Sequence, residues 1–128
     1  MLVGVGVDVL EVARVRRALA RHGPGLGSHA YTPAEIAACE RAADPAVRYA
    51  ELFTAKEAAW KAVGLSPPDT GAWADAEITT DAGGRPALAL HGRLREAARR
   101  RGAATLTPTF SHTRHHAIAC VFATNHGA

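Results

Sequence analysis

The sequence predicts an α+β fold in which a mainly antiparallel sheet packs against helices. Three observations indicate this class: a valine-rich apolar run at the start, a long helical segment in the middle, and two pairs of short apolar segments in the second half. Strands joined by short turns pair antiparallel, and the helices then cover one face of their sheet. We expect residues 1–128 to form a single domain, because a chain of this length buries about two-thirds of its unfolded surface.

The first segments are a strand and a helix. Residues 2–7 are apolar apart from glycines, which is typical of a fully buried strand, and Asp8 ends the run. Apolar residues then recur at spacings of three and four over residues 9–21, which is the spacing of one helix face.

Two helix starts follow. Residues 32–35 have the sequence Thr-Pro-Ala-Glu, a capping box with proline at the first helical position, and a short helix should begin there. The Asp-Pro pair at 44–45 repeats the arrangement and opens the longest helix. We expect this helix to end at Gly64, because glycine is a frequent C-terminal stop.

The second half contains two strand pairs around a helix. Residues 74–79 and 87–90 are joined by a glycine-containing turn and should form a hairpin. Residues 92–101 have helical character and precede a glycine. Residues 105–110 and 117–123 form the last predicted strand pair, with a polar, histidine-rich turn between them.

Composition narrows the function classes. The chain is 48% hydrophobic and 21% charged, which is typical of a folded domain. Its two cysteines are far apart, and neither a basic leader nor a membrane-spanning stretch is present, so we expect a cytoplasmic protein without a membrane partner. The net charge of +3 suits an acidic partner. Aromatic residues are only 5% of the chain and no helix-turn-helix or zinc pattern occurs, so we expect no nucleic-acid partner.

Asp8 is the first residue with chemical interest, because it ends a run that should be buried. A buried carboxylate needs a cation, N–H donors or water. The residues alone leave two interpretations open: a helix N-cap for the segment that follows, or a metal ligand.

The long helix holds the second group. Glu57 and Lys61 are four residues apart and share a face, which by itself predicts an ordinary surface ion pair. Lys56 falls inside the apolar stripe of the same helix, where a lysine must extend its ammonium to water, pair with an acid or serve a site.

The third group is the turn of residues 111–116, Ser-His-Thr-Arg-His-His. Three histidines suggest zinc, but no cysteine or acid stands at a supporting spacing, and solvated turn histidines are commoner. A phosphate-binding turn remains compatible with these residues.

These segments together resemble the holo-acyl-carrier-protein synthases, the short type of 4′-phosphopantetheinyl transferase. Residues 4–15, GVGVDVLEVARV, resemble the family's opening strand and helix. Residues 53–64, FTAKEAAWKAVG, resemble its signature helix and are the more specific match. Shorter matches cover residues 31–35, 73–78, 83–86, 110–113 and 117–119.

The resemblance implies a single-half phosphopantetheinyl transferase fold and a magnesium-dependent reaction. Coenzyme A would donate its phosphopantetheine arm to a serine of an apo acyl carrier protein, releasing adenosine 3′,5′-bisphosphate. Asp8 and Glu57 would be the protein ligands of Mg²⁺, which takes few carboxylates and completes its octahedron with waters and phosphates. Glu57, directly or through a metal-held water, would accept the serine proton, and Lys61 would reach a phosphate oxygen as a point charge.

The resemblance also assigns coenzyme A contacts. Lys56 would hold a neighbouring phosphate or pair with a carboxylate, and Gly64 follows the signature helix at the same site. Ser111, His112 and Thr113 would lie near the nucleotide end of coenzyme A.

Partners follow from the same resemblance. Carrier proteins are acidic, so the basic face formed by Arg14, Arg17 and Arg21 is expected to steer one toward the site. Longer members of the superfamily contain two such halves, and the short type resembles a trimer with active sites between subunits. We therefore expect a homotrimer in which His112 serves a site whose metal ligands come from the neighbour.

Two segments depart from the family pattern. Glu51-Leu52 stands where Gly-Arg often precedes the phenylalanine of the signature helix, and residues 65–68 replace a small glycine-containing turn. Arg48, one turn earlier, is a hypothetical substitute for the missing arginine. The first alternative is a catalytically silent carrier-binding module, and the second, less favoured, is a basic nucleic-acid-binding domain. Carriers of fatty acid, polyketide and peptide synthesis are all compatible with the sequence.

Overall fold

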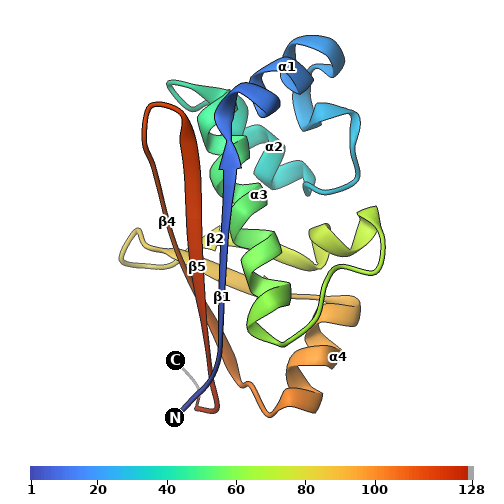
Figure 1. Cartoon of the computed structure of the whole chain (residues 1–128), viewed down its shortest axis with the longest axis vertical. Helices are drawn as coiled ribbons and strands as arrows, with labels where there is room; N and C mark the ends of the chain where they lie inside the picture. Colours follow the sequence, from blue (N-terminus) through green and yellow to red (C-terminus); the bar gives the residue numbers. More distant parts are fainter. Residues whose placement is uncertain (127–128) are drawn as a thin grey trace.

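The computed structural model describes residues 1–126, and Figure 1 shows the course of the chain. Strands and helices follow one another in the predicted order, and the two ends of the described chain meet, with the Met1 amino group 3.4 Å from Nδ1 of His126. The elements are β1 (Leu2–Glu11), α1 (Val12–His22), η1 (Pro24–Gly27), α2 (Pro33–Glu40), α3 (Pro45–Ala62), η2 (Thr70–Asp75), β2 (Ala76–Thr80), β3 (Pro86–Leu90), α4 (Gly92–Arg101), β4 (Thr105–His112) and β5 (His116–Thr124).

The main sheet has three antiparallel strands in the order β1-β5-β4, and β2 and β3 form a separate hairpin. The predicted α+β class with antiparallel pairing is therefore present. The prediction that the first strand is fully buried is wrong, because alternate residues face solvent: Val5, Val7 and Val9 are 45%, 51% and 57% exposed. Within residues 1–126, helices cover one face of this sheet, and the exposed valines lie on the other.

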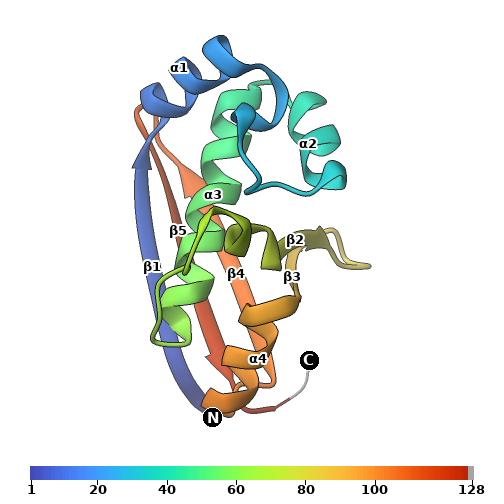
Figure 2. The ribbon, with the colours of Figure 1, turned by 90° about the vertical axis from the view of Figure 1, so that its right-hand side faces the viewer.

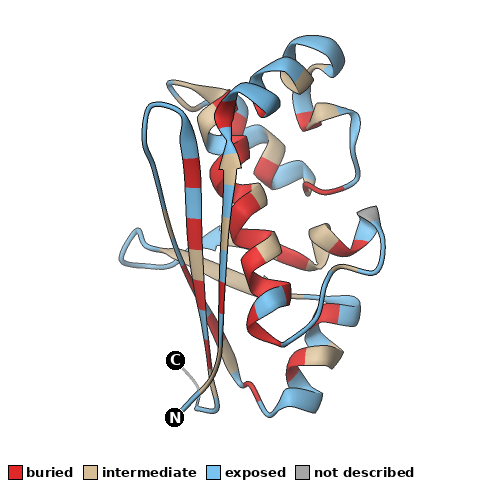
Figure 3. Cartoon of the chain, in the orientation of Figure 1, coloured by how far each residue is buried: buried red, intermediate tan, exposed pale blue. Residues whose placement is uncertain are grey.

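The α3 helix lies between the sheet and a second layer made of α2, η2 and the β2-β3 hairpin (Figure 2). This position explains why residues all around α3 are buried, from Tyr49 and Ala50 to Trp60 (Figure 3). Both apolar clusters of the core include residues of α3. A helix that is covered on all sides belongs to the interior of a domain.

The β1 strand approaches α3 closely because two glycines face the helix. A Cβ at Gly4 would overlap the carbonyl oxygen of Ala62, and a Cβ at Gly6 would overlap that of Ala58. Glycine is the residue that allows two backbones to come this near. The contact fixes the distance between the rest of β1 and the helix.

The helix starts are mostly as predicted. Thr32 and Glu35 form both bonds of the capping box that begins α2. Asp44 precedes Pro45 at the start of α3 but makes no side-chain cap, because its carboxylate accepts two hydrogen bonds from Arg16 of α1. This exposed ion pair joins the middle of α1 to the start of α3.

The last strand pair is longer than predicted. β4 continues through Ser111 and His112, so these residues belong to a strand and the turn is shorter than 111–116. The α4 helix spans the predicted residues and ends at Gly102, whose φ of 77° is in the left-handed region. No helix in the described part of the chain combines the length and the hydropathy needed to cross a membrane.

Candidate functional site

Asp8 lies in the middle of β1, on the face that packs against α3. Side chains alternate along a strand, so Asp8 follows Gly4 and Gly6 on this face. Lys61 Nζ donates to Asp8 Oδ1 at 3.1 Å and to the preceding main-chain carbonyl at 3.3 Å. The helix N-cap interpretation of Asp8 is wrong, because β1 continues to Glu11 and α1 begins after it.

Glu57 lies on α3 one turn before Lys61, and an indole holds its carboxylate. Trp73 Nε1, from η2, donates to Glu57 Oε1 at 3.2 Å. Among the described residues, Glu57 and Lys61 form no ion pair, because the Lys61 ammonium is directed to Asp8. The structure therefore brings both acids to the same part of α3. Asp8 reaches it through its bond to Lys61, and Glu57 is part of the helix one turn before that lysine.

The two carboxylates suit an ion that a phosphate ligand helps to hold. In the described part of the chain, Asp8 Oδ2 and Glu57 Oε2 receive no hydrogen bond, and no group of three or more His, Cys, Asp or Glu side chains gathers to hold a metal alone. Mg²⁺ is commonly bound through one or two carboxylates, with waters and substrate phosphates as the other ligands. The donor set fits Mg²⁺ on these grounds.

Lys56 has a different environment from the one expected of a phosphate ligand. Its side chain is 0% exposed, and Nζ contacts Glu35 Oε1 at 2.7 Å, Glu35 Oε2 at 2.8 Å and the carbonyl of Ala76 at 2.8 Å. An ammonium has three protons, and these acceptors engage all of them. Of the two roles considered for Lys56, pairing with a carboxylate is the one that the geometry supports, and binding coenzyme A directly does not fit.

Burial and charge act in opposite directions on Lys56. Desolvation lowers the pKa of its ammonium, while the adjoining Glu35 carboxylate raises it. Glu35 also accepts hydrogen bonds from the main-chain N–H groups of Thr32 and Ile78, at 2.8 and 2.7 Å. The buried pair therefore joins α2 and β2 to α3, and its role is to stabilise the fold.

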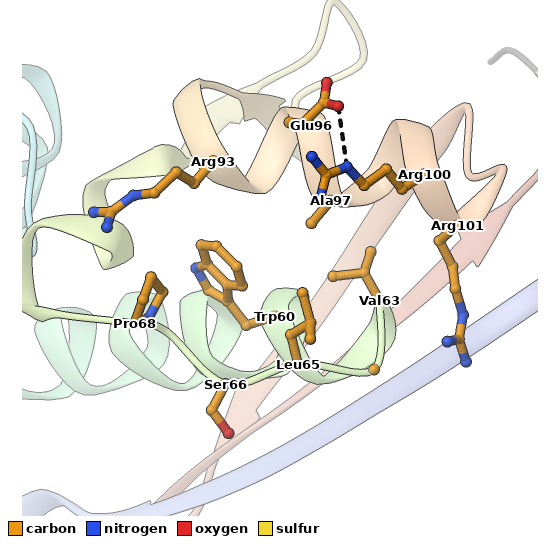
Figure 4. Close-up of a pocket in the computed structure, with 11 residues that line it drawn as sticks. Trp60, Val63, Leu65, Ser66, Pro68, Arg93, Glu96, Ala97, Arg100 and Arg101 are labelled. Carbon is orange, nitrogen blue, oxygen red and sulfur yellow. Dashed lines mark hydrogen bonds and ion pairs between the residues drawn. The ribbon is translucent and has the colours of Figure 1, made fainter.

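The end of α3 opens onto a cavity of about 620 Å³, which Figure 4 shows. Trp60 lines it from α3 and Val63 from the C-cap of that helix, and Arg93, Arg100 and Arg101 reach it from α4. Gly64, also on its wall, ends the helix region with a φ of 79°, as a glycine stop requires. Asp8 and Glu57 do not line this cavity.

His112 contacts α3 at a separate place. Its Nδ1 lies 3.1 Å from Glu51 Oε2, and the other oxygen of Glu51 is 3.6 Å from the guanidinium of Arg48. Glu51 is six residues before Glu57, about 9 Å along the helix axis. Within one chain, the structure groups His112 with Glu51 and gives it no contact with Asp8 or Glu57. Ser111 and Thr113 flank His112 and are exposed.

Arg48 and Leu52 line a second cavity of about 360 Å³ between α3, α2 and the β2-β3 hairpin. The Arg48 guanidinium lies 5.7 Å from the centre of the Phe110 ring, which also lines this space. An arginine that packs on an aromatic ring and pairs with an acid keeps a defined position.

The basic face predicted for the first helix is present on α1. Arg14, Arg17 and Arg21 are exposed and line one shallow concavity of about 270 Å³, together with Ala18 and His22. Their grouping follows from the helical spacing of three and four residues.

Comparison with known proteins identifies the family. The model of the 4′-phosphopantetheinyl transferase superfamily matches residues 4–121. The holo-[acyl-carrier-protein] synthase of Koribacter versatilis is 37% identical over 94% of this chain and 97% of its own length. That of Solidesulfovibrio magneticus is 43% identical over the same shares. The chain belongs to the holo-[acyl-carrier-protein] synthases.

Solved structures of this family have the same fold. The crystal structure of the holo-[acyl-carrier-protein] synthase from Neisseria meningitidis has a TM-score of 0.83 at 27% identity and covers 97% of this chain and 99% of that one. A coenzyme A complex of the synthase from Chronobacterium ammoniagenes has a TM-score of 0.75 at 26% identity, covering 94% and 95%. The predicted fold class is confirmed, and so is the family suggested by the motifs.

Sequence reasoning missed three side chains that shape the synthase site. Trp73 lay inside a recognised motif without an assigned role, Glu35 was assigned only to the capping box, and Glu51 was noted only as a departure from the family pattern. The capping box indicated one function of Glu35 but not its second partner, Lys56. No spacing rule predicts these contacts, because each joins residues from different elements.

Proposed function

We propose that this synthase transfers 4′-phosphopantetheine from coenzyme A to a serine of an apo acyl carrier protein in an Mg²⁺-dependent reaction that releases adenosine 3′,5′-bisphosphate. The observation that carries the proposal is the convergence of Asp8, Glu57 and Lys61 at one part of α3. Relatives named for the synthase reaction, and a relative whose structure was solved as a coenzyme A complex, support the substrate.

The proposed roles follow from the contacts. Asp8 Oδ2 and Glu57 Oε2 would hold Mg²⁺, which supplies positive charge beside the pyrophosphate of coenzyme A. The serine oxygen forms a bond to the β-phosphorus, the bond to the adenosine 3′,5′-bisphosphate oxygen breaks, and Glu57 accepts the serine proton, directly or through a water. Lys61, whose side chain is 47% exposed, is free to turn its ammonium from Asp8 to a phosphate oxygen.

Carrier docking is proposed for the basic face of α1. Arg14, Arg17 and Arg21 are exposed, and α1 directly follows the strand that contains Asp8. An acidic carrier would therefore be attracted close to the proposed metal site. Its pathway can be fatty acid, polyketide or peptide synthesis.

A homotrimer is part of the proposal, and the uncovered face of the main sheet supports it. Large apolar side chains face solvent there on two paired strands, and the register places Val5 opposite Phe122 and Val9 opposite Ile118. Exposed apolar faces of this kind mark protein interfaces. Second copies would cover this face, and His112 of one subunit would then complete a site whose acids come from its neighbour.

We also propose a cytoplasmic location and a single domain over residues 1–128. Cys39 and Cys120 are free thiols, as expected in a reducing compartment.

The test is a mass measurement on the carrier. The protein is incubated with an apo acyl carrier protein, coenzyme A and Mg²⁺, and the serine of the carrier is expected to gain one phosphopantetheine. Nucleotide release is followed in the same reaction, with a chelator as the metal control. Retained carrier binding without modification would replace the proposal with a silent binding module, and salt-sensitive binding to DNA or RNA without metal dependence would favour a nucleic-acid-binding domain.

Substitution of the proposed ligands tests the metal assignment. Asp8→Asn and Glu57→Gln keep the side-chain shapes, and Glu57→Gln keeps a carbonyl oxygen for the Trp73 indole. Each is expected to lower turnover by more than about 100-fold, because each removes a negatively charged ligand. The melting temperature and the subunit number should stay close to wild type. Turnover within a few-fold of wild type in either variant would contradict the assignment.

A further inference from the structure

The segment Asp69–Ala76, which contains η2, is held to α3 by contacts in both directions. From α3, Trp60 Nε1 donates to the carbonyl of Ala72 at 3.0 Å, and Lys56 Nζ donates to the carbonyl of Ala76 at 2.8 Å. In return, Trp73 Nε1 donates to Glu57 on α3. The three α3 positions lie within little more than one helical turn.

The Trp73 ring is itself fixed in place. Its centre lies 5.4 Å from that of Phe53 on α3, with the ring planes inclined by 34°. The buried Lys56 and Trp60 anchor the backbone on both sides of Trp73, so the indole has little freedom to turn. An anchored N–H donor keeps its acceptor in one orientation.

This donor engages only one oxygen of the Glu57 carboxylate. Oε1 accepts from Trp73, and within the described residues Oε2 has no donor. The bond occupies one lone pair of Oε1 and turns this oxygen toward the fixed indole, so that Oε2 is the oxygen better placed for an ion, whereas a free carboxylate can turn both oxygens toward it. Mg²⁺ demands a near-ideal octahedron at short distances, while Ca²⁺ takes six to eight oxygens and accepts bidentate carboxylates.

We propose that Trp73 is a positioning residue that restricts Glu57 to one-oxygen coordination and thereby favours Mg²⁺ over Ca²⁺. This inference rests on the proposed function, because it takes Glu57 as a metal ligand. It assigns to Trp73 a role in ion selectivity that acts through Glu57. The partners of metal-binding side chains are known to change metal affinity by about 10 to 100-fold when they are removed.

The variant Trp73→Phe tests the proposal, because phenylalanine keeps a ring against Phe53 and lacks the N–H. Trp60→Phe is the matched control. It also loses an indole hydrogen bond between α3 and this segment, but the acceptor is the carbonyl of Ala72 and not Glu57. Calorimetric titrations with Mg²⁺ and with Ca²⁺, on protein saturated with coenzyme A and without carrier, give the two affinities. Melting temperatures are measured in parallel.

The expected result for Trp73→Phe is a Mg²⁺ affinity about tenfold lower, with Ca²⁺ affinity equal to wild type or higher. Trp60→Phe should lower the melting temperature and leave the ratio of the two affinities unchanged. An unchanged ratio in folded Trp73→Phe, or an equal change in Trp60→Phe, would overturn the inference while leaving the transferase proposal standing. A wild-type protein that modifies its carrier without binding Mg²⁺ would overturn the metal assignment itself.

A second measurement covers the case in which Trp73→Phe fails to fold. In Trp60→Phe, Trp73 is the single remaining tryptophan. Mg²⁺ added with coenzyme A is expected to change its fluorescence, with the same half-saturation as the calorimetric titration. Fluorescence that does not respond while calorimetry detects binding would show that the indole does not sense the ion at Glu57, and the proposal would be abandoned.

Discussion

Lys56 shows how one buried residue can have several partners that its own position in the sequence does not reveal. Its place in the apolar stripe of α3 predicted a residue that must reach water, pair or serve a site. The structure selects the pair, because Glu35 from α2 and a carbonyl of β2 surround the ammonium. Helical periodicity places a side chain on a face, but it does not say which other element covers that face.

Removing the Lys56 charge should destabilise the fold. Lys56→Met would leave the Glu35 carboxylate buried and without its cation, and such changes typically cost about 3–5 kcal/mol of unfolding free energy. Urea denaturation measures the change. The double variant Lys56→Met with Glu35→Gln should recover part of the loss, because it removes the unpaired charge. Wild-type stability together with lost coenzyme A binding would instead indicate that Lys56 contacts the substrate.

Cys39 provides a pH-dependent test of the core. Burial raises the pKa of its thiol from the ordinary 9.0 to about 12, with smaller contributions from neighbouring charges. Between these values the native state keeps a proton that the unfolded state loses. The contribution of the thiol to stability is therefore complete below pH 9 and is lost as the pH rises toward 12.

The test is to measure the urea denaturation of wild type and of Cys39→Ala at equal protein concentration from pH 8 to 11. The free energy of unfolding of wild type should fall relative to that of Cys39→Ala above pH 9, by an amount on the order of a few kcal/mol across the range. Parallel curves would mean that the thiol of Cys39 is not desolvated in solution.

At the scale of elements, the contact between β1 and α3 builds the site. Gly4 and Gly6 let the strand touch the helix, and Asp8 comes next on the same face. The alternation of strand side chains thus converts a packing contact into the position of a proposed metal ligand. The glycines were visible in the sequence as interruptions of an apolar run, but their partner was not.

Gly6→Ala tests this coupling of packing and site. A Cβ there would overlap the Ala58 carbonyl and lie 2.7 Å from the main-chain nitrogen of Ala62, so β1 must move away from α3. We expect the unfolding free energy to fall by about 1–3 kcal/mol or more. We also expect half-maximal turnover to need a higher Mg²⁺ concentration, because Asp8 moves with the strand. Gly83→Ala in the exposed hairpin turn is the control. Equal effects of the two substitutions on the Mg²⁺ half-saturation would contradict this account.

At the scale of the whole molecule, the proposed trimer explains two features that one chain leaves incomplete. No described residue covers the apolar outer face of the main sheet, and His112 lies apart from the two acids. Both follow if subunits pack through that face and each site uses residues of two chains. The prediction of a fully buried first strand, wrong for the single chain, would then apply to the assembly.

Mixing two inactive variants tests shared sites. Asp8→Asn and His112→Ala should each be nearly inactive alone, while trimers formed from both, after subunit exchange, contain some sites with neither substitution. Mixed trimers are therefore expected to regain part of the wild-type turnover. Light scattering after size separation checks the subunit number. Mixed trimers that form and stay inactive would place Asp8 and His112 in the same chain's site, whereas wild-type turnover of His112→Ala alone would place His112 outside it.

The sequence by itself determined the order and type of the main strands and helices and the family, because helix caps, turn glycines and residue spacing act over a few neighbouring positions. Only the tertiary structure decided which side chains meet: Lys61 with Asp8, Lys56 with Glu35, Trp73 with Glu57, and His112 with Glu51. Each of these pairs joins different elements, and its geometry depends on how closely those elements pack. Local sequence preferences contain no information on that packing distance, which here depends on the fit of two glycines against a helix backbone.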